Sequence, residues 1–184
     1  MTLNTFAPRS TFQKPHNLPA LSTKSSVVVV GAGAFGGWTA LNLRRRGLDV
    51  TLFDAWGPGN SRSSSGDETR VIRSTYGDNE FYFDLNVRSL ELWKESEKKW
   101  NKKFFFNTGV LWMCYQEKTP LVDDSIPFAE KHNMEYAYLD KGELKKRFPQ
   151  INTTDIHHAY FDPFGGYLKA RESCQAVVEN FVKE

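Results

Sequence analysis

Three glycines with the spacing of a dinucleotide-phosphate loop lie near residue 30 of the 184-residue chain. Gly31 would permit a tight turn from strand to helix, Gly33 would let the backbone approach a pyrophosphate, and Gly36 would let the helix pack closely on the strand. The helix that starts here would present unpaired N–H groups and the positive end of its dipole to the phosphates, with Ala34 and Phe35 in its first turn. The spacing therefore predicts a dinucleotide site. The simpler alternative is a glycine-rich helix start in an unrelated α/β protein.

A carboxylate follows these glycines at the separation where dinucleotide-binding folds hold a ribose. Asp54 ends the next expected strand, roughly 20 residues further on. Its carboxylate would accept hydrogen bonds from ribose hydroxyls and would repel a 2′-phosphate, which argues against NADP. The glycines and Asp54 together leave FAD and NAD as open alternatives.

Two arginines, Arg70 and Arg73, lie in the serine-rich and charged segment 63–77. A guanidinium stays charged and offers a planar pair of donors that matches a carboxylate. Binding a substrate carboxylate in this way would orient the rest of the substrate for reaction. The alternative is that each arginine forms an ordinary salt bridge with one of the acidic residues nearby: Asp67, Glu68 or Asp78.

A strand–helix–strand unit is needed to position these residues. Val27–Val30 is a continuous β-branched run, typical of a strand buried on both faces of a parallel sheet. A helix is expected to follow as far as Arg46, with Gly47 as its C-cap. Asp49–Asp54 is expected to form the second strand. The length of the whole, about thirty residues, fits a minimal βαβ unit.

The rest of the chain alternates between helical and strand-like patterns. A hairpin is expected over Lys103–Tyr115, and Asp140 and Glu143 have the spacing of a capping box. The other expected elements are a loop over 55–69, helices over Asn79–Trp100, Asp124–Asn133 and Ala170–Lys183, strands over Tyr136–Leu139 and His157–Phe161, and a turn over 162–166.

The composition argues against several classes of protein. Hydrophobic residues make up 40% and charged residues 25%, and no apolar run approaches the roughly 18 residues that cross a bilayer, so neither disorder nor a membrane partner is expected. The net charge is +2, and no basic stripe with interleaved aromatic residues indicates nucleic acid. Residues 1–48 contain no Asp or Glu, which fits a solvated tail or an organellar transit peptide. The expected location is cytoplasmic, with an organelle as the alternative.

The histidines and cysteines lack the spacing of a metal site, and no metal is expected. His157 and His158 are adjacent in an expected strand, so one ring should face solvent, and His132 is expected at the surface. Cys114 and Cys174 are expected to be buried apolar residues, and their wide separation fits free thiols in a reducing compartment.

Five stretches of the chain resemble the D-amino-acid-oxidase superfamily of flavoenzymes, and most of all its branch of monomeric sarcosine, N-methyltryptophan and pipecolate oxidases. They are Val28–Arg46, Thr51–Asp54, Ser63–Gly77, Thr108–Trp112 and Phe161–Leu168. The resemblance implies an FAD-dependent oxidase of secondary or N-methyl amino acids. In such enzymes a hydride passes from the carbon beside the amine to the flavin, O2 reoxidises the flavin to give H2O2, and the imine hydrolyses. The implied partners are therefore a small amino-acid amine and O2.

The resemblance also implies roles for individual residues. Arg70 would lie close to the flavin ring, and Arg73 would bind the substrate carboxylate. Several relatives carry histidines where this chain has Ser64, Ser65 and Gly66, so the roles of those histidines do not transfer. The serines would bond phosphate or ribitol oxygens, or else form a plain loop. The expected cofactor contacts are Gly31, Gly33, Ala34, Phe35, Gly36, Asp54, Ser64, Ser65, Thr69 and Arg70.

The implied fold is α/β, with a Rossmann-like FAD-binding domain that begins with the βαβ unit and an inserted β-rich (α+β) substrate domain. The expected boundaries are an irregular extension over 1–25, the FAD-binding domain over 26–104 and 166–184, and the substrate domain over 105–165. Family members are about twice as long, so both domains are expected to be incomplete. We expect an N-terminal fragment that is inactive alone and pairs with a missing C-terminal half. The alternatives are an NAD-dependent Rossmann dehydrogenase and a non-catalytic nucleotide-binding remnant.

Overall fold

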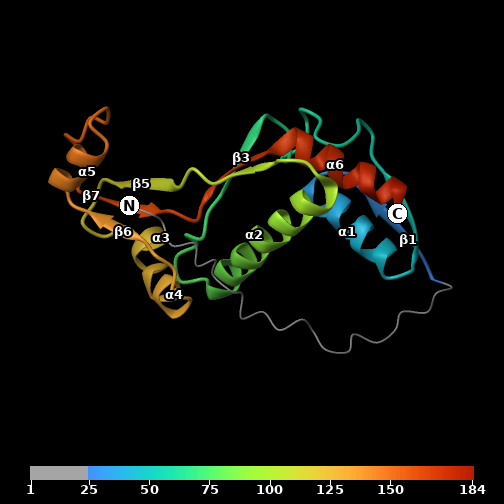
Figure 1. Ribbon diagram of the computed structural model, residues 1–184, viewed down its shortest axis with the longest axis horizontal. Helices are drawn as coiled ribbons and strands as arrows, with labels where there is room; N and C mark the ends of the chain where they lie inside the picture. Colours follow the sequence, from blue (N-terminus) through green and yellow to red (C-terminus); the bar gives the residue numbers. More distant parts are fainter. Residues whose placement is uncertain (1–24) are drawn as a thin grey trace. The chain divides into compact units, whose positions relative to one another are not determined.

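The computed structural model describes residues 25–184. They form two compact units: a βαβ unit made of residues 25–70 and 168–184, and a central unit made of residues 71–167. Figure 1 shows the helices and strands of both units, with labels where there is room. Residues 1–24 of the expected N-terminal extension, and the transit peptide considered for them, lie outside the described residues.

The βαβ unit has the element order that the sequence predicts. It consists of β1 (Ser26–Val30), α1 (Ala34–Arg45), β2 (Asp49–Phe53) and α6 (Ala170–Lys183). β1 and β2 pair in parallel, with Val30 opposite Phe53. Just beyond the C-cap of α1, Gly47 takes a left-handed φ of 84°, which ends the helix. α6 packs against α1, where the absence of a side chain at Gly37 admits Val177.

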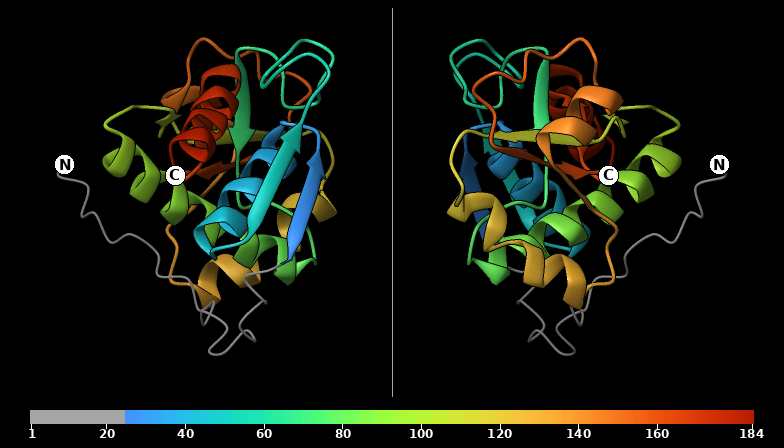
Figure 2. Two further views of the ribbon diagram at one scale, coloured as in Figure 1. Left: turned by 90° about the vertical axis from the view of Figure 1, so that its right-hand side faces the viewer. Right: turned by 90° about the vertical axis from the view of Figure 1, so that its left-hand side faces the viewer.

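One face of β1 is exposed, and the expectation that this strand is buried on both faces is wrong. Val28 and Val30 are 62% and 83% exposed, whereas Val29 faces α1. In the left view of Figure 2 the two strands lie side by side in front of α1. A run of valines has β propensity on both faces, but burial needs a second covering layer. Among the described residues of this unit, the helix covers only one face.

The central unit is built on an antiparallel sheet in the order β5–β7–β6. Its strands are β5 (Val110–Cys114), β6 (Ala137–Leu139) and β7 (His158–Asp162), and its helices are α2 (Glu80–Trp100), α3 (Pro120–Asp123), α4 (Ile126–Lys131) and α5 (Lys141–Arg147). Leu144 of α5 is fully buried against Leu139 and Ala159 of the sheet. A second core joins Phe83 and Val87 of α2 to α4.

A third sheet has the order β3–β8–β4, and it replaces the expected hairpin. Its strands are β3 (Thr69–Ile72), β4 (Phe105–Phe106) and β8 (Gly166–Lys169). β4 pairs with β8 while β5 pairs with β7, so the hairpin over Lys103–Tyr115 is wrong. The Asn107 side chain, between β4 and β5, donates to the carbonyls of Pro163 and Gly165, between β7 and β8. These bonds hold together the two segments that connect the third sheet to the β5–β7–β6 sheet.

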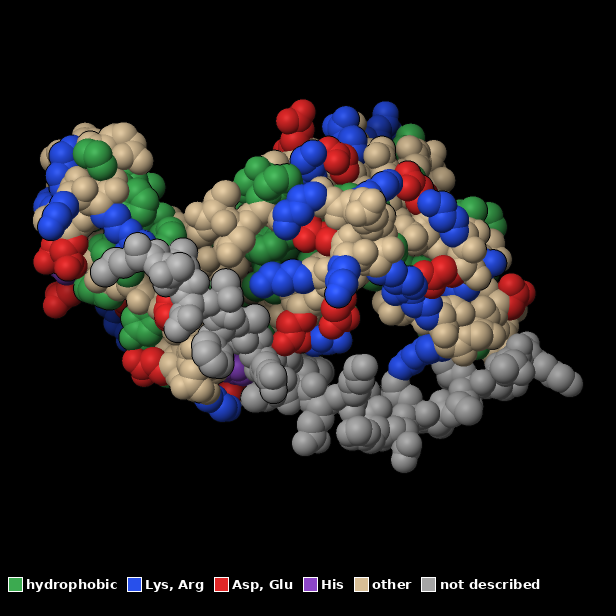
Figure 3. Space-filling model, viewed as in Figure 1, with side chains coloured by type: hydrophobic (Ala, Val, Ile, Leu, Met, Phe, Trp, Pro, Cys, Tyr) green, Lys and Arg blue, Asp and Glu red, His purple; other side chains and the backbone are tan. Residues whose placement is uncertain are grey.

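Helix boundaries follow the sequence signals closely where capping residues are present. α2 is capped by Asn79, whose side chain accepts from the Tyr82 N–H, and α5 has the predicted capping box between Asp140 and Glu143. The helix expected over Asp124–Asn133 is confirmed in a shorter form as α4, and the short helix α3 directly before it was not expected. None of the helices that the structure describes has the length and apolar character needed to span a membrane. On the face drawn in Figure 3, basic and acidic side chains are interspersed.

Candidate functional site

The turn between β1 and α1 needs glycine at two positions for two different reasons. Gly31 has a φ of 101°, which residues with a side chain rarely adopt, and its N–H donates to the Phe53 carbonyl over 2.7 Å. A Cβ atom at Gly36 would lie 1.8 Å from the Gly31 carbonyl oxygen. The helix therefore starts in direct contact with the end of the strand, which brings its N-terminal N–H groups to the sheet edge.

The N-terminus of α1 has the electrostatics of an anion site. Its N-cap residue is Gly33, which has no side chain to accept from the first N–H groups, and no acidic residue lies in the first turn. The Ala34 N–H donates to Oγ of Ser65 over 2.9 Å. Phe35 is 91% exposed beside this turn. No acidic residue of α1 itself compensates the positive end of the helix dipole, and the carboxylate of Asp54 contacts the Ala32 N–H just before the N-cap.

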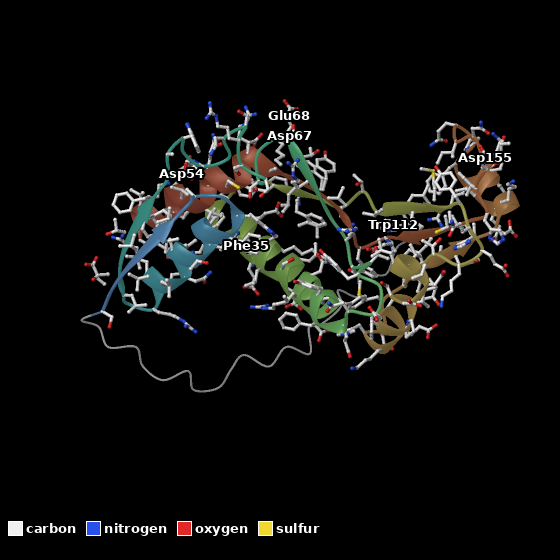
Figure 4. All side chains as sticks on the ribbon, turned by 180° about the vertical axis from the view of Figure 1, so that it is seen from behind. Phe35, Asp54, Asp67, Glu68, Trp112 and Asp155 are labelled. Carbon is white, nitrogen blue, oxygen red and sulfur yellow. The ribbon has the colours of Figure 1, made fainter. Side chains whose placement is uncertain are left out.

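Asp54 links the glycine turn to the loop that follows β2. Figure 4 shows it at the carboxyl end of that strand. Its Oδ2 accepts from the Ala32 N–H at 2.7 Å, and its Oδ1 accepts from the Trp56 and Gly57 N–H groups. These donors, the Ala32 N–H above all, lower the pKa of Asp54. A carboxylate has about four acceptor positions. Three are used, so an exposed anionic oxygen can still accept one bond.

The loop that contains Ser63, Ser64 and Ser65, called the serine loop below, lies against the turn between β1 and α1. Ser65 sits at the N-terminus of α1, its N–H donates to Oγ of Ser63 over 3.0 Å, and the Cys174 thiol of α6 lies 3.9 Å from its carbonyl oxygen. A Cβ at Gly66 would lie 2.3 Å from the Asn60 carbonyl oxygen, so this loop needs glycine there. Ser64 contributes its carbonyl oxygen, which accepts from Arg70. The βαβ unit therefore brings Ser65 to the turn and leaves the Ser64 hydroxyl exposed.

Arg70 forms the salt bridge that the sequence held open as an alternative. Its Nη1 lies 3.4 Å from Oδ2 of Asp67 and 2.9 Å from the carbonyl oxygen of Thr69, and its Nε donates to Ser64 over 3.1 Å. The Glu68 N–H and then Arg70 lower the pKa of Asp67. Because both partners are exposed, this pair is a weak restraint on the arginine. Arg70 thus holds the serine loop through these bonds, and its exposed guanidinium places a positive charge at the surface of the loop.

Arg73 belongs to the central unit and has a different environment. Its guanidinium carbon lies 5.0 Å from the ring centre of Tyr76 and 5.3 Å from that of Trp112. Among the residues that the structure describes, no carboxylate lies within salt-bridge distance of it. The indole Nε1 of Trp112, a residue of β5 labelled in Figure 4, is buried without an acceptor. Arg73 therefore packs against two aromatic rings, and its N–H donors can bind an anionic ligand.

Trp112 and Asp162 are candidate site residues that sequence reasoning missed. The signal for Trp112 was limited to its place in one of the five resembling stretches, and Asp162 appeared only as part of a turn. Asp162 is buried, and its Oδ2 accepts from the Ser74 N–H at 3.3 Å while its Oδ1 accepts from Phe164 and Gly165. It therefore fixes the backbone directly after Arg73.

Burial of Asp162 makes the stability of the central unit depend on pH. Burial raises the pKa of this carboxyl, and its N–H donors lower it only in part. The folded chain thus binds the proton more tightly than the unfolded chain, whose carboxyl titrates near about 3.9. Between that value and the raised pKa, the free energy of unfolding falls as the pH rises. The free energy of unfolding of wild type, relative to that of Asp162→Asn, should therefore fall as the pH rises through this window.

The measurement is urea unfolding of wild type and Asp162→Asn from about pH 4 to about pH 8, followed by tryptophan fluorescence. The asparagine also turns an N–H₂ group toward the Ser74 N–H, which costs about 1–3 kcal/mol at every pH. Asp155→Asn, an exposed change in the same unit, is the control. A difference between wild type and Asp162→Asn that stays constant with pH would contradict the raised pKa.

The histidine and cysteine predictions have mixed outcomes. His157 is exposed and His158 is buried, so one of the pair faces solvent as predicted. Cys114 and Cys174 are free and buried as predicted, and burial raises the pKa of both thiols. The prediction that His132 is a surface residue is wrong. It is buried because its ring packs on Phe83 of α2, with ring centres 5.1 Å apart.

The parallel strand–helix–strand, its glycine turn and the carboxylate after the second strand place the chain in the dinucleotide-binding class of α/β proteins. The chain belongs to the FAD dependent oxidoreductase family (DAO), which matches residues 26–184. It is 34% identical over 159 residues to monomeric sarcosine oxidase from Bacillus sp. (strain B-0618), covering 86% of this chain and 41% of that protein. It is 24% identical to N-methyl-L-tryptophan oxidase from Yersinia pestis (strain Pestoides F), covering 83% and 41%.

The solved structures agree with this family. L-proline dehydrogenase from P. horikoshii superposes with a TM-score of 0.70 at 25% identity, covering 87% of this chain and 42% of that chain. The chain therefore spans about two fifths of the length of the relatives that it matches. The recognition of a sarcosine-oxidase-like flavoenzyme family and of an incomplete α/β FAD-binding fold is confirmed.

Proposed function

We propose that the βαβ unit binds FAD, as the nucleotide-binding part of an oxidase that acts on secondary or N-methyl amino acids. The observation that carries the proposal is the N-terminus of α1, where Gly36 sits against the Gly31 carbonyl, the N-cap residue has no side chain and the first turn has no acidic residue. A pyrophosphate fits this cradle, because the donors there are N–H groups and a side chain at Gly33 would meet Ser65 at 3.2 Å.

The residues of the βαβ unit would divide the cofactor between them. The N–H groups at the start of α1 and the Ser65 hydroxyl would bind phosphate oxygens. The remaining acceptor position of Asp54 would bind a ribose hydroxyl, which is also why a 2′-phosphate is disfavoured. The exposed guanidinium of Arg70 can leave Asp67 at little cost and turn toward the isoalloxazine ring.

The central unit would supply the substrate contact. Arg73 would bind the substrate carboxylate through its planar donors, and the Trp112 N–H would donate a further hydrogen bond. This would hold the carbon beside the amine in one orientation and exclude water around it. The chemistry that bound FAD supplies is acceptance of a hydride from that carbon and transfer of the electrons to O2, giving H2O2. The division expected from the sequence, with the FAD-binding part at 26–104 and 166–184 and the substrate part at 105–165, would assign Arg73 to the FAD-binding part, although it lies in the compact unit 71–167.

Activity of the 184 residues by themselves is expected to be low. The chain spans 41% of the length of the Bacillus sarcosine oxidase, so most residues of that enzyme have no counterpart here. We expect weak FAD binding and little peroxide formation. An NAD-dependent dehydrogenase remains the second candidate because the βαβ unit alone serves either cofactor.

A titration with FAD, NAD and ADP tests the proposal. FAD should bind more tightly than NAD, with quenching of flavin fluorescence, and ADP should compete. Asp54→Asn should weaken FAD binding roughly 10- to 100-fold, because a charge-assisted bond to ribose is worth about 1.5–3 kcal/mol. Asp49→Asn, an exposed change at the start of the same strand, is the control.

Two results would decide between the alternatives. Tighter binding of NAD than of FAD would favour the dehydrogenase. FAD binding with no peroxide formed from sarcosine or another N-methyl amino acid, in the chain alone and in the presence of a C-terminal half taken from a relative, would favour a non-catalytic nucleotide-binding protein.

A further inference from the structure

A cluster of three potential metal ligands lies in the central unit, on elements that the proposed function does not use. Glu80 and Asp84 stand one turn apart on the same side of α2, and His132 caps the C-terminus of α4. One ligand atom from each residue lies within 4.8 Å of the others. The cluster unites residues that are far apart in the sequence, which is why spacing alone gave no sign of it.

His132 and one carboxylate oxygen of Asp84 are buried, whereas Glu80 is half exposed and contacts Lys131. The His132 side chain is 1% exposed, and its Nε2 lies 2.8 Å from Oδ1 of Asp84. At this distance the two atoms pair with each other, whereas Nδ1 of His132 is buried without a hydrogen-bond partner among the described residues. A buried polar atom without a partner costs about 1–3 kcal/mol, and native structures contain few of them. An imidazole nitrogen buried without a partner, on a ring that contacts one carboxylate and lies close to a second, therefore indicates a ligand.

The donor set selects the kind of ligand. One imidazole nitrogen and two carboxylate oxygens match Zn²⁺ and similar divalent transition metals, whereas Mg²⁺ and Ca²⁺ prefer oxygen alone. Phe83 packs on the His132 ring and holds its orientation, as an ordered metal ligand requires. The Glu80 side chain is 41% exposed, so the site is open to solvent on that side and can admit a water molecule as the fourth ligand.

We propose that Glu80, Asp84 and His132 form a binding site for a divalent transition metal such as Zn²⁺. The site is independent of flavin binding. It also has a built-in competitor, because the ammonium group of Lys131 contacts Glu80. A metal ion takes the place of this ammonium and satisfies the buried imidazole and carboxylate at the same time. Removal of the competitor and removal of a ligand should therefore change the affinity in opposite directions.

Calorimetric titration of the metal-free, tag-free chain with Zn²⁺ tests the site. Wild type should bind one ion per chain. His132→Gln should weaken binding by at least about 100-fold, since even indirect contacts of a metal site are worth 10- to 100-fold. Lys131→Met should strengthen binding by up to about 5-fold, the value of an exposed ion pair. His157→Gln, a change to an exposed histidine of the same unit, should leave the affinity unchanged.

Glu80→Gln is the second ligand variant, because a change at the half-exposed Glu80 is less disruptive to packing than one at buried His132. Its loss of Zn²⁺ affinity, with the circular dichroism spectrum of wild type, supports the site even if His132→Gln unfolds. Absence of stoichiometric Zn²⁺ binding, or equal affinity in wild type and Glu80→Gln, overturns it. Asp84 and His132 would then form a buried imidazole–carboxylate contact only.

Discussion

Gly36→Ala is expected to abolish FAD binding and to destabilise the βαβ unit by about 3 kcal/mol or more. The added Cβ would lie 1.8 Å from the Gly31 carbonyl oxygen and 2.9 Å from its carbon. Both are backbone atoms at the end of β1, so relief requires that the helix and the strand move apart. That movement also removes the N–H groups from the place where a pyrophosphate would bind. Thermal unfolding and an FAD titration of the same preparation measure the two effects.

Gly37→Ala is the matched control on the same helix. Its Cβ would meet Cγ1 of Val177 at 3.2 Å, and a valine side chain on α6 can shift by the small amount required. Helix propensity favours alanine over glycine by about 1 kcal/mol, which offsets the crowding. Gly37→Ala should therefore keep the melting temperature and the FAD affinity close to those of wild type. If Gly36→Ala behaves in the same way, close strand–helix contact is not what makes the turn a phosphate site.

The features predicted best from the sequence are those whose cause is local. The turn at Gly31–Gly36 and the capping box between Asp140 and Glu143 each depend on residues within one turn of the chain. Steric freedom and hydrogen bonding at these positions follow from residue type alone. The βαβ order and the recognition of the family rest on such local patterns, and both are confirmed.

The features predicted wrongly are those that depend on what lies opposite a segment. The residues of β1 have the same propensity whether or not a layer covers Val28 and Val30, so periodicity could not show that this face is exposed. The hairpin failed for a related reason. β4 and β5 are adjacent in sequence, but β4 pairs with β8 about sixty residues later in the chain and β5 pairs with β7 about fifty residues later.

The residues of the candidate site show the same contrast between local causes and tertiary contacts. Asp54 was found because its position is counted from the glycines, and Arg73 because of a segment that resembles a family. His132 was placed at the surface, since nothing near it in sequence reveals Phe83 and Asp84. Asp162 looked like an ordinary turn residue, because its bond to the Ser74 N–H spans a long stretch of chain. Such roles depend on tertiary contacts, and these contacts cannot be inferred from a single sequence.

Arg73→Lys is expected to raise the KM for carboxylate-bearing substrates roughly 10- to 100-fold. Lysine keeps the charge but loses the planar pair of donors and the stacking on Tyr76 and Trp112. Sarcosine and a secondary amine of similar size without a carboxylate form the matched substrate pair. In a peroxide assay, Arg73→Lys should raise the KM for sarcosine and leave the KM for the amine without a carboxylate unchanged. Where turnover of the chain is too low, the rise in melting temperature with saturating sarcosine gives the same comparison by binding.

Trp112→Phe separates the two contributions to this contact. Phenylalanine keeps a ring against the Arg73 guanidinium but removes the buried Nε1 donor, which has no acceptor in the described part of the chain. If that N–H donates to the substrate carboxylate, Trp112→Phe weakens sarcosine binding while the fold is preserved. If it does not, removal of an unsatisfied buried donor stabilises the unit and leaves sarcosine binding unchanged.

Arg88→Lys, on α2 and paired with Glu91, controls for loss of a guanidinium as such. An equal effect of Arg73→Lys on both substrates would mean that Arg73 stabilises the central unit and does not bind the carboxylate.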